Sequence, residues 1–486
     1  MSRRVTVVYD DRAAPPAGID AIVGAARYSE VLRRRVSLGE TVRRASVAGG
    51  AAELVHLLDE QDARVLAEGI EAGPADRVFL HLPSCLMPTR EGALAAEVAK
   101  GRFAMESLLL APPFGDVAAG LLSPRDAVSL LRARDAGARR EVVLRLAAAN
   151  PSMLDPCGLA DLRRPEAFLR FMGDATEARH FNTTERSGAV FRKSSADREK
   201  MAREHGFFHV APERMKAFLQ PTFDFADDGT TAGYSTERLH VPDAALQFIH
   251  RAFDPASFSV LLDRFFAFLA ARPTRADGVA AVRDRARAEI LGKMRARLDA
   301  LLDTAEGRRL DAVLGAAGPC GDLRAMQARA ERLIEAAIGR DGSAAVAVGH
   351  GDPCFSNILF DRRIGLLRLV DPRGARTLEE AWMHPLYDLA KFTHSALGGY
   401  DFVNNDPFEC ALDEGLRLAL SLHDGGPPTW CRDAVRDRLG GELFVVRAYE
   451  LSLFMSMLPL HRDHPRKLSG FALIACGLIE ELERMA

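Results

Sequence analysis

The chain has 486 residues, and its 64 Lys and Arg against 67 Asp and Glu give a net charge of −3 at pH 7. This balance gives no electrostatic reason to expect a nucleic-acid partner, and no apolar run approaches the roughly 18 residues that a membrane span needs. Hydrophobic residues make up 48% of the chain, which is globular composition, and the length predicts about three domains.

The cysteines are scattered along the chain without a CxxC pair, and no long apolar segment follows the N-terminal Met-Ser-Arg-Arg. A disulfide framework and a structural zinc site are therefore not expected. The absence of a leader pattern and the cysteine usage together favour a cytoplasmic location.

The first region, residues 1–175, is predicted to be an α/β domain. Arg4–Tyr9 and Val78–Leu82 are apolar runs typical of buried strands, and Gly49–Gly73 between them has helical composition. Strand, helix and strand in this order predict a parallel sheet. Neither common glycine-rich phosphate loop occurs here, so no motif marks a nucleotide site.

The second region, residues 178–243, alternates strands with a helix. Gly188–Lys193 and Tyr234–Leu239 are predicted strands, and the charged stretch Ala196–Phe208 between them is predicted to be a helix.

The third region, residues 244–486, is predicted to be mostly helical. Helices are expected over Ala276–Leu314, with Gly278 and Gly292 as weak points, and over Asp322–Arg340. A strand over Ala344–Val348 then interrupts the helices, and the part of the chain beyond residue 374 again has helical composition.

Three oxygen-bearing side chains are predicted to converge near this strand. Asp352 and Asn357 lie five residues apart in the loop that follows it, and Asp371 comes directly after a predicted hairpin of residues 358–370. Because a hairpin returns the chain to its start, Asp371 is expected beside that loop. Carboxylate and amide oxygens suit Mg²⁺, and a carboxylate without metal can accept a proton from a hydroxyl. This division of labour is that of kinase-type phosphoryl transfer.

The same residues resemble the aminoglycoside phosphotransferase and choline kinase family. The pattern is H-G-D-x-x-x-x-N at His350–Asn357, a hairpin, and V-D-P-R-G at Val370–Gly374. The resemblance covers roughly residues 178–486 and implies an α+β, protein-kinase-like fold of two lobes that uses ATP and Mg²⁺. It implies a catalytic base at Asp352, an orienting residue at His350, Mg²⁺ ligands at Asn357 and Asp371, and a support of the catalytic loop at Asp388.

The resemblance makes residues 178–243 the small lobe of this fold. Lys193 ends a predicted strand and would contact the ATP phosphates, while Glu204 in the next helix would hold the lysine. Glu199 is the alternative helix glutamate. The residues that would frame the adenine are Glu237, Arg238 and Leu239. Thr183–Gly188 holds a single glycine, so no amides are assigned to cover the phosphates.

The large lobe is residues 244–486, with its helical stretch at about 256–340 where the family forms its acceptor surface. The segments VDPRG and FSNILFD resemble kinase domains of bacterial capsule and cell-surface polysaccharide loci, which often follow a sugar-nucleotidyltransferase-like domain. Leu159–Phe168 resembles a helix near the end of such a domain, but the usual glycine-rich loop after the first strand is missing. Residues 1–175 are therefore expected to be a degenerate companion domain.

The sequence thus predicts an ATP-dependent kinase with an alcohol group as acceptor, on a small cell-envelope building block. A sugar or sugar phosphate is favoured. A lipid alcohol such as ceramide or a sphingoid base comes second and would bring peripheral membrane contact, and an aminoglycoside-type antibiotic comes third. A nucleotide-binding pseudokinase or scaffold is the alternative from another class.

Overall fold

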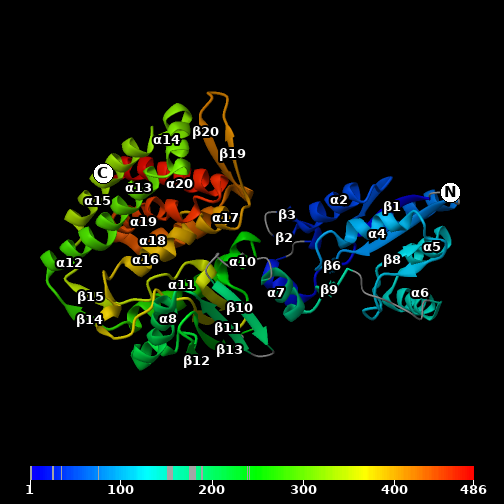
Figure 1. Cartoon of the computed structure of the whole chain (residues 1–486), viewed down its shortest axis with the longest axis horizontal. Helices are drawn as coiled ribbons and strands as arrows, with labels where there is room; N and C mark the ends of the chain where they lie inside the picture. The colour runs from blue at the N-terminus through cyan, green and yellow to red at the C-terminus, as the bar shows by residue number, and fades with distance from the viewer. Residues whose placement is uncertain are drawn as a thin grey trace. The chain divides into compact units, whose positions relative to one another are not determined.

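The computed structural model describes residues 3–24, 27–33, 36–74, 76–149, 157–173, 182–187, 190–237, 239 and 241–486. The chain divides into two compact units, Met1–Glu177 and Ala178–Ala486. In Figure 1 the first unit runs from blue to cyan, and the second from green to red.

The first unit is built on a five-stranded sheet in the order β4-β1-β5-β8-β7. Strands β4 and β5 run parallel to β1 between them, and β8 runs antiparallel to β5 and β7. The predicted parallel pairing of the first two apolar runs is therefore confirmed. The strands of this sheet are β1 (Arg4–Asp10), β4 (Glu53–Leu57), β5 (Arg77–Pro83), β7 (Leu108–Leu109) and β8 (Gly120–Leu122).

The prediction of one helix over Gly49–Gly73 is wrong, because the segment holds both β4 and helix α3 (Glu60–Glu71). The Asp59 carboxylate accepts hydrogen bonds from the backbone N–H groups of Gln61 and Asp62, which fixes the start of the helix there. The residues before this cap pair with β1 as a strand.

Helices cover both faces of the sheet in the first unit. Val8 and Phe79 pack with apolar residues of α3, α5 and α6 on one face. Val5 lies an odd number of residues from Val8, so it faces the opposite side, where it approaches Gly101 at the end of α4. The other elements are α1 (Ala17–Val23), β2 (Leu32–Arg33), β3 (Val36–Ser37), α2 (Leu38–Ala48), β6 (Leu86–Pro88), α4 (Ala93–Gly101), α5 (Pro124–Arg132), α6 (Ala136–Ala149), β9 (Leu159–Asp161) and α7 (Pro165–Gly173).

The second unit begins with a four-stranded antiparallel sheet in the order β10-β11-β13-β12. Helix α8 (Arg198–Val210) packs against β12 and β13. The predicted strand–helix–strand order is confirmed, but β12 between the helix and the last strand was not predicted. The strands are β10 (Asn182–Ser187), β11 (Val190–Ser195), β12 (Thr222–Asp227) and β13 (Ala232–Glu237).

The rest of the second unit is mostly helical, as predicted. Its helices are α9 (Glu213–Lys216), α10 (Ala244–Ile249), α11 (Pro255–Ala271), α12 (Val279–Ala286), α13 (Lys293–Leu302), α14 (Ala305–Ala317), α15 (Leu323–Arg340), α16 (Tyr387–Ala396), α17 (Tyr400–Asn404), α18 (Thr429–Leu439), α19 (Leu443–Met457) and α20 (Pro465–Met485). Its strands are β14 (Thr274–Ala276), β15 (Ala345–Val348), β16 (Ile358–Asp361), β17 (Leu366–Leu369), β18 (Trp382–Met383), β19 (Phe408–Leu412) and β20 (Leu418–Leu422).

Two stretches of this unit that were predicted to be helical contain a break, one at a helix cap and one at a hairpin turn. The stretch Ala276–Leu314 is not one helix, because the Thr304 hydroxyl accepts from the backbone N–H of Gly307 and starts a new helix, α14. The region after residue 374 also contains a hairpin, β19 with β20. There the Asp413 carboxylate accepts from the backbone of Arg417 and closes the turn.

The predicted hairpin of residues 358–370 is confirmed as β16 paired with β17. The core beside it anchors the loop that precedes it. Phe355 in this loop is fully buried, and its ring lies edge-on to Phe392 of α16, with the centroids 5.2 Å apart. Phe392 in turn stacks on Phe265 of α11. The aromatic core therefore holds the loop rigidly against two helices.

One stretch of the described chain, His423–His461, is long and apolar enough to cross a membrane by length and composition alone. However, 83% of its most apolar window is buried inside the fold, and a core helix passes the same test. It is therefore weak evidence for a membrane span.

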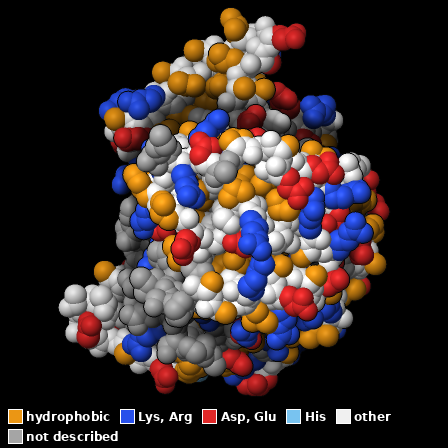
Figure 2. All heavy atoms as spheres, turned by 90° about the vertical axis from the view of Figure 1, so that its right-hand side faces the viewer, with side chains coloured by type: hydrophobic (Ala, Val, Ile, Leu, Met, Phe, Trp, Pro, Cys, Tyr) orange, Lys and Arg blue, Asp and Glu red, His pale blue; other side chains and the backbone are white. Residues whose placement is uncertain are grey.

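On the face that Figure 2 displays, acidic and basic side chains lie interspersed.

Candidate active site

A buried ion pair joins the small sheet of the second unit to helix α8. Lys193 on β11 donates from Nζ to Oε2 of Glu204 at 2.7 Å, and Tyr234 on β13 donates its hydroxyl to the same oxygen at 2.9 Å. Lys193 also donates to Oδ1 of Asp371 at 3.0 Å. One lysine therefore connects the sheet, the helix and the segment after the hairpin.

The electrostatics of this cluster follow from its burial. Burial alone would lower the pKa of Lys193, but the charges of Asp371 and Glu204 more than offset this and raise it. Burial raises the pKa of Glu204, although Lys193 opposes the shift. The lysine therefore stays charged, as a phosphate contact requires.

A close backbone approach keeps Glu204 beside Asp371. Gly374 has φ +86°, and a Cβ there would lie 2.5 Å from the carbonyl carbon of Arg203 in α8. The Ala375 N–H donates to the Arg203 carbonyl at 2.9 Å. Only glycine permits this approach, which brings the V-D-P-R-G segment into contact with the helix that carries Glu204.

Asp388, at the start of α16, fixes the backbone of the loop at His350–Asn357. This fully buried carboxylate accepts from the backbone N–H groups of His350 at 2.9 Å and Gly351 at 2.7 Å, and from Nη1 of Arg272 at 3.1 Å. The Asp352 N–H donates to Nδ1 of His350 at 3.3 Å. Burial lowers the pKa of His350, which keeps its ring neutral and able to accept that bond.

Asp352 lies in this loop with its side chain 37% exposed, and Oδ1 is 2.9 Å from Nζ of Lys391 on α16. Burial alone would lower the pKa of Lys391, but the Asp352 carboxylate raises it. Lys391 therefore remains charged and holds the carboxylate in one orientation. Because over a third of the Asp352 side chain is exposed, its carboxylate is able to accept a proton from a ligand.

Asn357 and Asp371 lie side by side, because the Val370 N–H donates to the Asn357 carbonyl at 3.0 Å. The Asn357 amide nitrogen donates to the Asp352 carbonyl at 2.9 Å, which turns its amide oxygen away from that bond. Asp371 has φ +53°, a conformation that non-glycine residues adopt rarely, and its side chain is half exposed.

Asn357 and Asp371 fit a Mg²⁺ ion whose remaining ligands are water and the phosphates of a nucleotide. No cluster of three or more His, Cys, Asp and Glu side chains able to hold a metal occurs in the described residues. Asn357 and Asp371 would supply one amide oxygen and one carboxylate. Mg²⁺ commonly takes one or two carboxylates and completes its shell with water and substrate phosphates.

The residues predicted to frame the adenine lie at and just after the end of β13. Glu237 pairs with Val190 across the sheet, and its carbonyl accepts from the side-chain amide of Gln220 at 2.9 Å. Leu239 is half-buried. Arg238 lies outside the described residues. The alternative helix glutamate, Glu199, is exposed and pairs with Arg376 instead of Lys193.

Sequence reasoning missed three residues that complete the site: Tyr234, Arg272 and Lys391. Lys391 lies three residues after Asp388 on α16, in the segment PLYDLAKF. Its helical spacing could have placed it near the catalytic loop. Arg272 and Tyr234 come from elements distant in sequence from their partners, and no local signal marks them.

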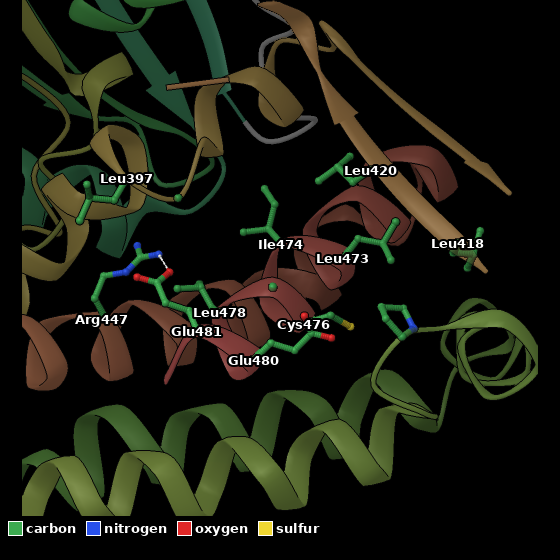
Figure 3. Close-up of a pocket in the computed structure, with 13 residues that line it drawn as sticks. Leu397, Leu418, Leu420, Arg447, Leu473, Ile474, Cys476, Leu478, Glu480 and Glu481 are labelled. Carbon is green, nitrogen blue, oxygen red and sulfur yellow. Dashed lines mark hydrogen bonds and ion pairs between the residues drawn. The ribbon is translucent and has the colours of Figure 1, made fainter. Parts of the chain in front are cut away.

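A cavity of about 400 Å³ lies elsewhere in the second unit, lined partly by α20 and β20 (Figure 3). Its Arg447 donates to Glu481 at 2.6 Å, and none of the predicted site residues lines it. The cavity is therefore separate from the cluster around Asp352.

Neither a family model nor a curated protein matches the chain. Among solved structures it is similar to aminoglycoside phosphotransferase APH(4)-Ia. The apo form of a thermostable mutant has a TM-score of 0.37 and 13% identity, over 63% of this chain and 94% of that one. A ternary complex with AMP-PNP and hygromycin B scores 0.38 at 12% identity, over 65% and 97%. A third structure of the same enzyme scores 0.36 at 12% identity, over 66% and 99%. At these scores the likeness says nothing about the chemistry of this chain.

Proposed function

We propose that the second unit is an ATP- and Mg²⁺-dependent kinase that phosphorylates a hydroxyl group of a small molecule. The observation that carries this proposal is the buried Lys193–Glu204 pair in contact with Asp371, beside the loop that presents Asp352. A cation for phosphates, oxygen ligands for Mg²⁺ and a proton acceptor are the parts that phosphoryl transfer needs.

Each residue has a role in this proposal. Lys193, held by Glu204 and Tyr234, positions the phosphates of ATP. Asn357 and Asp371 hold Mg²⁺, which supplies positive charge against the phosphate oxygens. Asp352 orients the acceptor hydroxyl and takes its proton, while Lys391 fixes the carboxylate. The segment Glu237–Leu239 frames the adenine.

We further propose which class of acceptor the kinase uses and where in the cell it acts. A sugar or sugar phosphate used in building the cell envelope is favoured, in the cytoplasm. A lipid alcohol follows, because helix α11, at the start of the stretch proposed for the acceptor, is rich in apolar side chains. An aminoglycoside-type antibiotic comes third, because a polycation would favour a markedly acidic cleft, which a net charge of −3 over this length does not demand.

The test is ADP release by the purified full chain with ATP, Mg²⁺ and a panel of hydroxyl acceptors. Asp352→Asn preserves the shape of the side chain but removes the proton acceptor. We expect it to lower turnover by about 10²-fold or more while Mg·ATP still raises the melting temperature. Near-normal turnover in this variant would overturn the assignment of Asp352. A wild-type chain that binds Mg·ATP without any transfer would instead support the nucleotide-binding scaffold.

A further inference from the structure

Four cations lie near Tyr387 and Asp352: Lys293, Arg297, Arg373 and Lys391. We propose that the acceptor of this kinase is itself an anion, a hydroxyl compound that already carries a phosphate group. This inference rests on the proposed function and names the substrate class of the same site.

Two helices bring three of these cations together. On α16, Tyr387 and Lys391 are four residues apart and share a face, and on α13 Lys293 and Arg297 do the same. The two faces meet where Nζ of Lys293 donates to the Tyr387 hydroxyl at 3.2 Å. Lys391 in turn contacts Asp352. The α13 pair therefore lies one side chain away from the pair that holds the proposed base.

Arg373 brings the fourth cation from the segment after the hairpin. Its N–H donates to the His350 carbonyl at 2.9 Å. A Cβ on Gly351 would lie 2.6 Å from Cβ of Arg373, so the arginine runs alongside the catalytic loop. Arg373 is exposed, and among the described residues its guanidinium makes no hydrogen bond or ion pair. This cation is available to a ligand.

The cations lack matching acids. Within the described part of the chain, Asp352 is the one carboxylate paired with any of the four, through Lys391. Arg297 donates to the Ser456 carbonyl at 3.1 Å, and Lys293 donates to the Tyr387 hydroxyl, with its ammonium also over the ring of that tyrosine. The four cations therefore have one paired carboxylate among them, and their side chains range from half-buried to exposed.

The pKa of Tyr387 is also shifted by the excess of positive charge around it. Burial would raise the pKa of Tyr387, yet the charges of Lys391, Lys293 and Arg373 lower it below its usual value. Burial, together with the charges of Arg297 and Lys391, lowers the pKa of Lys293. The lowered pKa of Tyr387 follows from the cations around it, whereas burial is the largest cause for Lys293 and the two neighbouring cations add to it.

A phosphate group suits this place better than other acceptor chemistry. It brings close to two negative charges and several strong acceptor oxygens, which lysine and arginine bind with charge-assisted hydrogen bonds. A carboxylate brings one charge and would leave more of the imbalance. A polycationic aminoglycoside would add like charges to it.

The transferred phosphate of ATP does not account for these cations. The lysine on the nucleotide side is Lys193, which contacts Asp371. Lys293 and Arg297 contact Tyr387 and Ser456, and neither makes a hydrogen bond or ion pair with Asn357 or Asp371 in the described chain. They therefore lie apart from the proposed Mg²⁺ ligands, next to the face of α16 that carries Lys391.

The experiment measures anion binding on the full chain with its nucleotide site filled by Mg·AMP-PNP. The probe is inorganic phosphate, titrated against sodium chloride at equal ionic strength, with the melting temperature of the second unit as the readout. We expect a saturable rise with phosphate alone. Lys293→Gln and Arg297→Gln should each weaken the apparent affinity about tenfold or more, the scale of one lost charge-assisted hydrogen bond.

The matched control is Arg295→Gln, which removes a cation from the same helix. Arg295 is exposed and pairs with Glu331 at 2.9 Å. This variant should bind phosphate like the wild type. A second arm compares ADP release with hexose monophosphates and with their parent hexoses, and we expect kcat/KM to favour the phosphates.

The outcomes separate the two proposals. If Mg·AMP-PNP does not raise the melting temperature, the proposed function fails, and this inference fails with it. If the nucleotide binds but phosphate stabilises no more than chloride, the inference alone is overturned. Equal phosphate affinity in Arg297→Gln and Arg295→Gln, or a preference for uncharged or cationic acceptors, overturns it as well.

Discussion

Removal of the Asp388 carboxylate tests how the catalytic loop is held in place. Asp388→Ala takes away the acceptor of two backbone N–H groups, at His350 and Gly351, and the partner of Arg272, whose side chain is only 7% exposed. Loss of one partner of a buried ion pair costs about 3–5 kcal/mol, and an unsatisfied buried N–H about 1–3 kcal/mol. Because these costs overlap, we expect about 4 kcal/mol of destabilisation.

The assay is urea unfolding followed by tryptophan fluorescence. The two tryptophans of the chain, Trp382 and Trp430, both lie in the second unit, so the signal reports that unit alone. Asp388→Asn keeps an acceptor oxygen and should lose about half as much. The double variant Arg272→Met/Asp388→Ala should lose clearly less stability than the sum of the two single variants. Each single variant leaves one buried charge without its partner, whereas the double variant leaves none. A loss below about 1 kcal/mol in Asp388→Ala, or strict additivity, would refute this reasoning.

Three further predictions concern the phosphates, the pH dependence and the independence of the two units. Lys193→Met should lower kcat/KM for ATP by about 10²-fold, while Glu199→Gln, at the exposed rival glutamate, should stay within about twofold; equal effects in steady-state kinetics would show that the wrong pair was chosen. Burial raises the pKa of the fully buried Asp401 to about 7 from its usual value of 3.8. Because the pKa of Asp401 is higher in the folded than in the unfolded chain, stability is lost as pH rises from about 4 to about 7, at up to about 1.4 kcal/mol per pH unit. Asp401→Asn should therefore flatten this part of the stability–pH curve. An unchanged slope in that variant would contradict the prediction. A chain that begins at Ala178 should keep the melting-temperature rise with Mg·ATP, because every proposed nucleotide residue lies beyond that point; a folded truncation without the rise would place part of the site in the first unit.

The part of the site that is local in sequence could be predicted from residue patterns. Asp352, Asn357 and Asp371 lie within one loop and one hairpin, so a short turn suffices to bring them together. Lys193 and Glu204 are eleven residues apart and meet because a strand leads directly into a helix. Such arrangements depend on few and short-range constraints.

The supporting residues depend on tertiary packing, which residue patterns do not carry. Arg272 meets Asp388 across 116 residues of sequence, and Lys293 meets Tyr387 across 94. The same limit applies to the fold: a threonine cap divides the predicted long helix at Thr304, and β4 forms because β1 offers it a parallel edge. Composition favours a helix in both places until the cap or the partner strand is known.

The end of β1 in the first unit explains why we expect the chemistry in the second. Asp10 ends this strand at the carboxyl edge of the parallel strands, where ligands bind in such sheets. However, its carboxylate is already held by Arg12 at 2.7 Å and by Nε2 of His81 at 3.1 Å. Burial would raise the pKa of Asp10, but these two partners lower it, so its charge is balanced within the unit. A metal ion or nucleotide would have to displace Arg12, which also pairs with Glu60. Asp371 is also paired with a cation, but that cation is Lys193, which we propose contacts the ATP phosphates, and half of the Asp371 side chain is exposed. We therefore interpret the first unit as a companion domain.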